Sequence, residues 1–312
     1  MSNDITRDDR AVGECEGDGF EVELGALVDE SSFAFRLHRE DDRGVERSGA
    51  QQESERREAI IRLVGLRKRF GAQVVLDGLD LEIGEGRTIV VLGASGSGKS
   101  VLLKHIVGLI RPDEGEVWFG GVRVDTMGER AWGAVRKQIG FLFQLSALFD
   151  SMTVRENLEF PLVEHTSLKA RARRDRVAEV LEHVDLDGVM DKRPAELSGG
   201  QQKRVALARA IIMKPRAILY DKPTTGLDPI RADGIARLIN RMKRDLGVTS
   251  VVVTHDLEAA AKVADRVVLI GDGRVIADGT LDDLRRSRDA RVRHFIEGKD
   301  VETREAVEEA SA

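Results

Sequence analysis

The sequence predicts an α/β fold with a largely parallel β-sheet, an antiparallel β edge and a helical insertion. From residue 59 onward, short apolar runs rich in β-branched residues alternate with stretches of amphipathic helical periodicity. This alternation is typical of parallel strands joined by crossover helices. A glycine-rich segment at 93–100 also separates one apolar run from the helical pattern that follows it. The 312 residues are sufficient for one large domain of this class.

The expected elements follow one another in a regular order. The first two stretches alternate like antiparallel edge strands, whereas the later runs are apolar throughout, as in buried strands. In chain order we expect strands at 59–70, 74–83 and 88–93, a helix at 99–110, a strand pair at 116–124, a strand at 217–221, a helix at 230–247, and β-rich runs at 250–256 and 266–279. The charged section from about 145 to 195 is the predicted helical insertion, with Pro161 and Pro194 as expected breaks.

Residues 1–57 differ in composition from the rest of the chain. They include 16 acidic and 8 basic residues and so have a net charge of −8. The whole chain has a net charge of −6, so the remaining residues have a net charge of +2. Because sustained periodicity is missing, we interpret them as a mostly disordered extension. The alternatives are a partner-binding arm or an over-long choice of start codon. We expect residues 58–295 to form the folded domain and 296–312 an acidic tail.

Composition restricts the class of protein. No stretch reaches the roughly 20 apolar residues that span a bilayer, and the first ten residues lack the apolar core of a signal peptide. We therefore expect a soluble chain with any membrane role supplied by a partner. Cys15 is the single cysteine, which excludes an intrachain disulfide and fits a reducing cytoplasm. The charge balance does not have the basic excess typical of nucleic-acid binding.

The segment GASGSGKS matches the phosphate-loop pattern G-x-x-x-x-G-K-[ST] between a predicted strand and a predicted helix. Its residues are Gly93, Ala94, Ser95, Gly96, Ser97, Gly98, Lys99 and Ser100, with Val101 directly after them. Backbone amides of such a loop surround phosphate oxygens, and the helix N-terminus after it favours anions. Lys99 is expected to neutralise the phosphates and Ser100 to ligate Mg²⁺. The flanking strand and helix argue against a turn without chemical consequence.

Asp221 ends the apolar run AILYD. An aspartate after a strand is often only a turn or cap residue. Together with a phosphate loop, however, a strand-end carboxylate is expected to hold Mg²⁺ directly or through water.

The segment LSGGQQKR at 197–204 lies between the phosphate loop and Asp221. Ser198, Gly199, Gly200 and Gln201 open another predicted helix, which makes a second anion site. In this order, the three motifs resemble those of the ATP-binding-cassette (ABC) ATPases over roughly residues 60–295. The resemblance implies a P-loop NTPase fold with a RecA-like core, an antiparallel β edge and a helical signature subdomain. It also implies a homodimer, or a heterodimer with a similar cassette, in which each signature caps the ATP held by the other phosphate loop.

Four further positions match the same family. The resemblance implies that Phe70 stacks on adenine, although core packing is an alternative for this residue. It implies that Gln144 senses Mg²⁺ and the attacking water and links the site to a membrane partner. Asp228 would couple the two sites across the dimer, and His255 would contact the γ-phosphate.

A finer resemblance concerns the transported substrate. The stretches FLFQLSALFDSMTVRENLEFPL, LYD, GLDPI and DARVRHFIEG are similar to the ATPase subunit of Mla- or Mce-type lipid transporters. Such subunits work with a membrane permease and a lipid-binding Mce-domain protein at the cytoplasmic face of the membrane. The alternative is the ATPase of an importer for another solute, because such importers share much of the same cassette. The long polar N-terminal extension is not part of this pattern.

Lys222 departs from the family pattern, which has a catalytic glutamate directly after the strand-end aspartate. A general base contributes about 10²–10⁴-fold to a rate, and a charged ammonium cannot accept the proton. We therefore expect ATP binding with slow or lost hydrolysis. The alternatives are that Lys222 points elsewhere while His255 and Gln144 sustain turnover, or that the chain is a non-hydrolysing, nucleotide-gated clamp or regulatory subunit. A cassette acting on DNA or ribosomes is less expected, since those carry two cassettes or large insertions.

Overall fold

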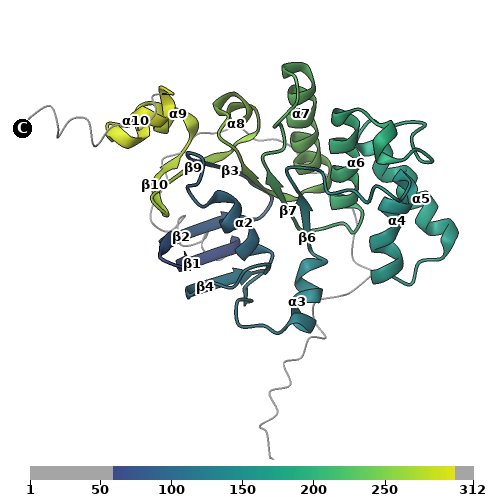
Figure 1. Ribbon diagram of the computed structural model, residues 1–312, viewed down its shortest axis with the longest axis horizontal. Helices are drawn as coiled ribbons and strands as arrows, with labels where there is room; N and C mark the ends of the chain where they lie inside the picture. The colour runs from purple at the N-terminus through teal and green to yellow at the C-terminus, as the bar shows by residue number, and fades with distance from the viewer. Residues whose placement is uncertain (1–58, 299–312) are drawn as a thin grey trace, which may run out of the picture. The chain divides into compact units, whose positions relative to one another are not determined.

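A computed structural model describes residues 59–298, all of which belong to one compact unit of the chain (Figure 1). The strands are β1 (Ala59–Phe70), β2 (Gln73–Gly84), β3 (Thr88–Leu92), β4 (Glu114–Phe119), β5 (Val122–Arg123), β6 (Ile139–Leu142), β7 (Ala217–Asp221), β8 (Thr249–Val253), β9 (Arg266–Gly271) and β10 (Arg274–Gly279). The helices are α2 (Lys99–Ile106), α3 (Glu129–Arg136), α4 (Val154–His165), α5 (Ala170–His183), η2 (Pro194–Glu196), α6 (Gly199–Ile211), α7 (Pro229–Leu246), α8 (Leu257–Val263), α9 (Leu281–Arg285) and α10 (Ala290–Ile296). The predicted extension at 1–57 and most of the predicted tail at 296–312 lie outside the described residues.

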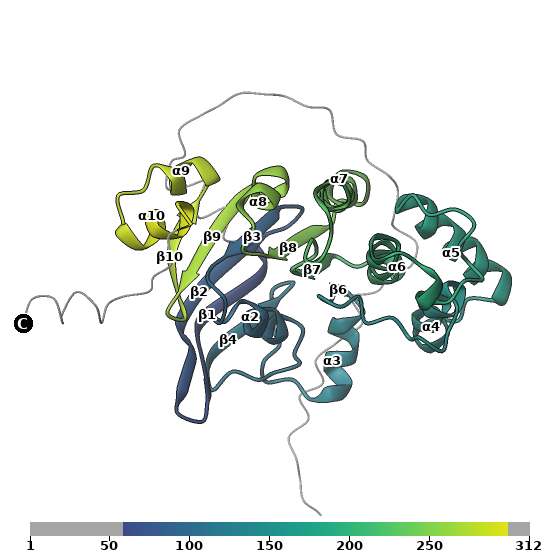
Figure 2. The ribbon, with the colours of Figure 1, turned by 45° about the horizontal axis from the view of Figure 1, so that its top comes forward.

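The strands form two sheets of different kinds. Six strands in the order β10-β9-β3-β8-β7-β6 form the larger sheet, in which every neighbouring pair except β9 and β10 is parallel. The other strands, in the order β2-β1-β4-β5, form an antiparallel sheet. The structure thus confirms both the parallel core and the antiparallel edge. Figure 2 shows α7 and α8 on one side of the larger sheet, with α2 and α3 on the other.

Two apolar layers cover the two faces of the larger sheet. Side chains alternate between the faces along a strand. In β3, Val90 and Leu92 enter a buried cluster with helices α4 to α8, whereas Ile89 and Val91 enter a second cluster with α2 and the antiparallel sheet. Because both faces are covered, the parallel strands read as continuous apolar runs in the sequence.

The helical insertion is present, but one predicted break in it is wrong. Pro161 lies inside α4, which continues to His165, whereas Pro194 does open a new element at η2. Buried Leu158 and Leu162 pack α4 on both sides of the proline, so tertiary packing compensates for the backbone hydrogen bond that proline removes. The helix predicted at 99–110 also ends early, at Ile106. Within residues 59–298, the structure has no helix with the length and apolar character needed to cross a membrane.

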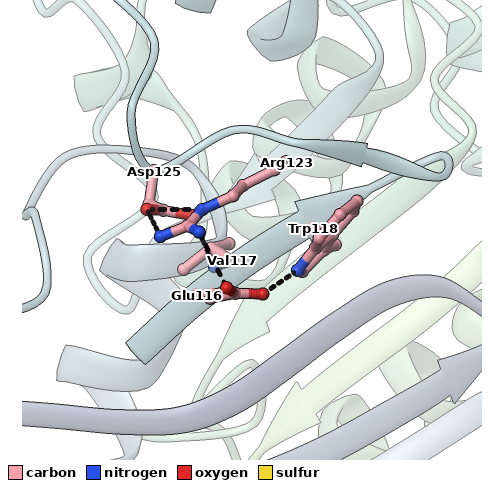
Figure 3. A network of polar contacts seen from close by, with 5 residues as sticks. All are labelled: Glu116, Val117, Trp118, Arg123 and Asp125. Atoms are coloured by element: carbon pink, nitrogen blue, oxygen red, sulfur yellow. Dashed lines mark hydrogen bonds and ion pairs between the residues drawn. The ribbon is translucent and has the colours of Figure 1, made fainter. Parts of the chain in front are cut away.

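A polar network holds the short strand β5 against β4 (Figure 3). Arg123 donates from Nη1 to Glu116 at 2.7 Å and from Nη2 to Asp125 at 3.0 Å. Glu116 also accepts a hydrogen bond from Nε1 of Trp118 at 2.8 Å, and Asp125 accepts one from the Val117 amide at 2.8 Å. These bonds close the hairpin at the edge of the antiparallel sheet, where, among the described strands, β5 pairs with β4 alone.

Gly140 of β6 sets how closely α6 approaches the larger sheet. A Cβ atom at this position would lie 2.4 Å from the carbonyl oxygen of Ala210 in α6. We therefore expect Gly140→Ala to lower the free energy of unfolding by about 1–3 kcal/mol, the usual range for overpacking. Denaturant unfolding of the purified chain measures this change. Gly133→Ala in α3 is the matched control, because its Cβ meets nothing within 4 Å and alanine favours the helix. Equal stability of the two variants would contradict the close approach.

Candidate functional site

Four loops that follow parallel strands meet at one edge of the larger sheet. The phosphate loop follows β3, His255 follows β8, Asp221 ends β7, and Gln144 follows β6. These strands are neighbours in the order β3-β8-β7-β6, and each neighbouring pair is parallel. Their carboxyl ends therefore lie side by side, at the edge where open α/β sheets bind ligands. The structure thus brings together predicted site residues that are far apart in the sequence.

The phosphate loop leads from the fully buried strand β3 into α2. Its first residue has to be glycine, since a Cβ at Gly93 would lie 2.5 Å from the Ile270 carbonyl oxygen and 2.6 Å from Ser97 Oγ. Gly98 is the N-cap residue of α2, in the left-handed region with φ 93°. This cap residue makes no side-chain hydrogen bond with the first helical amides. Those amides remain available to an anion.

Lys99 lies buried beneath the loop and donates to loop atoms. Its Nζ donates to the carbonyl oxygens of Gly93 at 2.8 Å and Ala94 at 2.6 Å, and to Ser97 Oγ at 3.1 Å. The pKa of Lys99 is lowered to about 8, mainly by burial and also by the positive charge of Lys222, while Asp221 acts in the opposite direction. A bound phosphate would therefore find a cation inside the loop, at a position where water has little access.

Ser100 and Asp221, the two predicted metal ligands from distant parts of the sequence, are in direct contact. The Ser100 hydroxyl donates to Asp221 Oδ1 at 3.0 Å. A hydroxyl and a carboxylate are the hard oxygen donors that Mg²⁺ prefers, and the ion usually keeps further sites for phosphate and water. Residues 59–298 contain no group of three or more His, Cys, Asp or Glu that could hold a metal alone. The donor set therefore fits Mg²⁺ that is shared with a nucleotide.

Lys222 follows Asp221 in a backbone conformation that is uncommon for lysine. Its φ of 47° lies in the left-handed region, and its amide donates to the Val253 carbonyl oxygen at the end of β8 at 2.8 Å. Such a residue costs about 1 kcal/mol or more and persists where its surroundings fix it. The positive charge of Lys222 contributes to the lowered pKa of Lys99, so the two residues are electrostatically coupled. The expectation that Lys222 faces the phosphate site is consistent with this electrostatic coupling.

His255 is exposed at the end of β8, whereas the backbone of Gln144 is held by a hydrogen bond from α6. His255 is exposed and follows Thr254, whose amide donates to the Val91 carbonyl oxygen at 3.2 Å. The carbonyl oxygen of Gln144 accepts a hydrogen bond from Nζ of Lys203 in α6. Lys203 is not among the site residues predicted from the sequence; it is a buried lysine on the same helical face as Leu207 and Ala210. A charged residue within this apolar stripe was the signal that could have identified it.

Phe70 ends β1 and is 47% exposed. It belongs to neither apolar cluster, so the alternative of core packing does not apply to it. Nζ of Lys68 lies 5.6 Å from the centroid of its ring, which places a cation next to an accessible aromatic face. An exposed ring of this kind is available to stack on a planar base.

The signature residues open α6 with a reciprocal cap. Ser198 Oγ accepts from the Gln201 amide at 3.4 Å, and Gln201 Oε1 accepts from the Ser198 amide at 2.9 Å. Asp228 caps α7 in a similar way and pairs with Arg231, whose side chain also lies against Gly200. Among the described residues, no hydrogen bond or ion pair connects 198–201 with the phosphate loop. Asp228 and the signature are thus brought near each other through Arg231.

The comparisons with known proteins agree with this geometry. A family model described as ABC transporter matches residues 76–225. The chain is 41% identical over 240 residues to the intermembrane phospholipid transport system ATP-binding protein MlaF of Haemophilus influenzae, covering 77% of this chain and 91% of the relative. It is also 41% identical to the sulfate/thiosulfate import ATP-binding protein CysA of Bradyrhizobium diazoefficiens, covering 78% of this chain and 70% of the relative.

Solved structures match the fold as well. The dimeric post-hydrolysis structure of the ATP-binding cassette MJ0796 bound to ADP and Pi is 34% identical, with a TM-score of 0.66, and covers 71% of this chain and 98% of the other. The fold and the site thus define an ABC-type ATPase cassette. The chain belongs to the family of ABC transporter ATP-binding proteins, and it is the ATP-binding subunit of such a transporter.

The lowered pKa of Lys99 predicts how ATP affinity depends on pH. A buried ammonium with a pKa of about 8 loses its proton above that pH, so ATP binding then requires proton uptake. We expect the ATP dissociation constant to rise above pH 8, by up to about tenfold per pH unit. Lys222→Met removes a positive charge that lowers this pKa, so the rise should begin at a higher pH.

Calorimetric titration of ATP from neutral to alkaline pH measures the pH dependence for the wild-type chain and for Lys222→Met. Lys169→Met, at an exposed site, is the control, and an affinity that does not change with pH would contradict the prediction.

Proposed function

We propose that this chain closes as a homodimer around Mg²⁺-ATP and energises a membrane permease that moves phospholipid or another hydrophobic molecule. The observation that carries the proposal is the meeting of the phosphate loop, Asp221, Lys222, Gln144 and His255 at one sheet edge. The phosphate loop would bind the nucleotide phosphates, and Ser100 with Asp221 would hold Mg²⁺, which neutralises phosphate charge.

The homodimer is supported by the presence of two anion sites in one chain, the phosphate loop and the capped N-terminus of α6, and by the dimeric structure of the similar cassette MJ0796. In such a homodimer, each site would complete a nucleotide site with its counterpart from the other cassette. Residues 198–201 and Asp228 would then contact the ATP held by the partner cassette, with Phe70 against the adenine of the chain's own ATP.

Slow hydrolysis is supported by the chemistry at Lys222. Its charged ammonium has no lone pair to accept a proton from the attacking water. The alternative general base is the exposed His255, assisted by Gln144. We therefore place ATP-driven closure first in the cycle of this subunit and expect hydrolysis, and with it reopening, to be slow.

A lipid-related substrate is supported by the similarity to the MlaF relative, which is 41% identical to this chain over 240 residues. A methionine import ATP-binding protein, MetN, is 38% identical over 223 residues. The identity of 41% to CysA equals that to MlaF, however, so an importer for another solute is the second candidate.

An apolar surface beside Gln144 supports a permease partner. Leu145 is 88% exposed, and Phe149, Phe160 and Val163 are exposed as well. The rings of Phe149 and Phe160 pack edge to face at 5.4 Å, which extends the surface from the segment after Gln144 onto α4. A surface of this composition fits an apolar helix of a membrane protein. The chain would then lie on the cytoplasmic face of the membrane, held there by the permease.

Purification of the tagged chain from detergent-solubilised membranes of its own cells tests the proposal. We expect a permease and an Mce-domain protein to co-purify, with phospholipid in the extract. A periplasmic solute-binding protein in their place would favour the importer, and no membrane partner would favour a regulatory clamp.

Phe160→Glu is expected to abolish co-purification of the permease without changing ATP affinity. Val122→Glu, at an exposed apolar site on the antiparallel edge, is the matched control.

A further inference from the structure

Side chains from two helices hold the backbone that follows Gln144. From α6, Lys203 donates to the carbonyl oxygen of Gln144, and Arg209 Nη2 donates to those of Ala147 at 2.8 Å and Ser146 at 3.3 Å. The guanidinium of Arg209 also lies 5.7 Å from the ring centroid of Phe149. The segment 144–149 is thus attached to α6 at three carbonyl groups, those of Gln144, Ser146 and Ala147.

The other end of the same segment is fixed from α4. Asn157 is fully buried, and its Oδ1 accepts from the Phe149 amide at 2.8 Å. Its Nδ2 donates to the carbonyl oxygens of Phe149 at 3.1 Å, Met152 at 3.2 Å and Thr153 at 3.0 Å. Asn157 therefore fixes where the segment joins the helical insertion, while Lys203 and Arg209 fix how it lies against α6.

The held segment has an unfavourable backbone conformation. Ser146 has φ 62° and Ala147 has φ 50°, two consecutive residues other than glycine in the left-handed region. Each such residue costs about 1–3 kcal/mol and persists where its surroundings determine it. The carbonyl groups of these two residues are the ones that Arg209 binds. The contacts from α6 therefore offset a local cost and select one conformation of the segment.

Lys203 is an expensive residue to place at this point. It is 5% exposed, and burial lowers its pKa below the usual value, although nearby Asp221 acts in the opposite direction. A buried ammonium is tolerated where hydrogen bonds satisfy it. Lys203 belongs to the helix that carries the signature. It donates a hydrogen bond to the Gln144 carbonyl oxygen and interacts electrostatically with Asp221, the predicted metal-binding carboxylate.

We propose that Lys203 and Arg209 are positioning residues that fix the Gln144 segment to the signature helix, so that α6 and Gln144 move as one body. Lys203 lies five residues from the cap Ser198, about 7.5 Å along the helix, and Arg209 about 9 Å further. A nucleotide that draws the N-terminus of α6 toward the partner cassette thereby moves Gln144 in the chain's own site. This part of the inference rests on the proposed function, whereas the attachment itself can be tested without nucleotide.

Amide hydrogen exchange of the full chain without nucleotide is the first test. Lys203→Met keeps the length of the side chain but leaves the Gln144 carbonyl without its donor. We expect exchange at Ser146 and Ala147 to accelerate by about tenfold or more, and Lys203→Arg to restore most of the protection. Arg204→Met is the matched control, since Arg204 lies on the same helix but donates to the Val184 carbonyl oxygen. Unchanged exchange in folded Lys203→Met would overturn the inference, as would equal acceleration in Arg204→Met.

Exchange in the presence of Mg²⁺-ATP tests the coupling. In the wild-type chain, protection of 144–149 and of 198–201 should appear at the same ATP concentration. In Lys203→Met the two midpoints should separate by about tenfold, and coincident midpoints would overturn the coupling. Arg209→Gln provides the same comparison if Lys203→Met does not fold. If the wild-type chain does not bind ATP, the proposed function fails, while the exchange without nucleotide still decides on the attachment.

Discussion

Replacing Lys222 with glutamate is expected to raise steady-state Mg²⁺-ATP hydrolysis by about 10²–10⁴-fold, the usual contribution of a general base. Residue 222 directly follows Asp221 at the carboxyl end of β7, and its charge acts on Lys99 of the phosphate loop. A carboxylate at this position can accept the proton of the attacking water, which an ammonium cannot do. The rate should be measured at saturating ATP, because the reversal of charge is also expected to weaken nucleotide binding.

Two further variants separate the base from the charge. Lys222→Met removes the cation without adding a base, so it should not reach the rate of Lys222→Glu. The double variant Lys222→Glu/Lys99→Ala should lose the gained activity, because the phosphate site is then damaged. A wild-type rate that already equals that of Lys222→Glu would show that His255 and Gln144 sustain turnover. In that case the chain is an ordinary transporter motor, and the proposed role of Lys222 is wrong.

The second large effect is expected at Lys99, where alanine should weaken ATP binding by about 10- to 100-fold. The ammonium lies beneath the loop and donates to Gly93, Ala94 and Ser97, positions from which it can transfer its hydrogen bonds to phosphate oxygens. Hydrogen bonds to charged groups contribute about 1.5–3 kcal/mol, which corresponds to this loss of affinity. Calorimetric titration of ATP into the purified variant measures it.

A second lysine on the same helix provides the control for Lys99. Lys104 is an exposed residue of α2, so Lys104→Ala changes the net charge equally without touching the loop. ATP affinity should be unchanged in Lys104→Ala. Equal loss of affinity in both variants would mean that general electrostatic attraction, and not the buried position of Lys99, determines binding.

Most of the fold could be predicted because its signals are local. The buried strands such as β3 and β8 are continuous apolar runs, and the phosphate loop has a fixed spacing between its strand and its helix. The break expected at Pro161 failed, because packing of Leu158 and Leu162 keeps α4 continuous across the proline. Local propensity thus gave a wrong answer where tertiary contacts outweigh one missing hydrogen bond.

The site could be predicted as a set of residues but not as a set of contacts. Spacing and resemblance identified Ser100 and Asp221 separately, and the parallel order of β3, β8 and β7 explains why they meet at 3.0 Å. The attachment of Gln144 to Lys203 could not be derived in this way. It depends on how closely α6 packs against β6 at Gly140, and no sequence pattern specifies that distance.

Sedimentation velocity of the wild-type chain with Mg²⁺-ATP, followed over time with analysis of the bound nucleotide, shows whether the ATP-bound dimer persists. We expect the wild-type dimer to persist and to contain intact ATP, whereas the Lys222→Glu dimer should decay to monomers with ADP. Lys99→Ala should remain monomeric at an ATP concentration that saturates the wild-type chain but not this variant. A wild-type dimer that decays to ADP-bound monomers as fast as Lys222→Glu would contradict the account, and so would a wild-type chain that stays monomeric in saturating ATP.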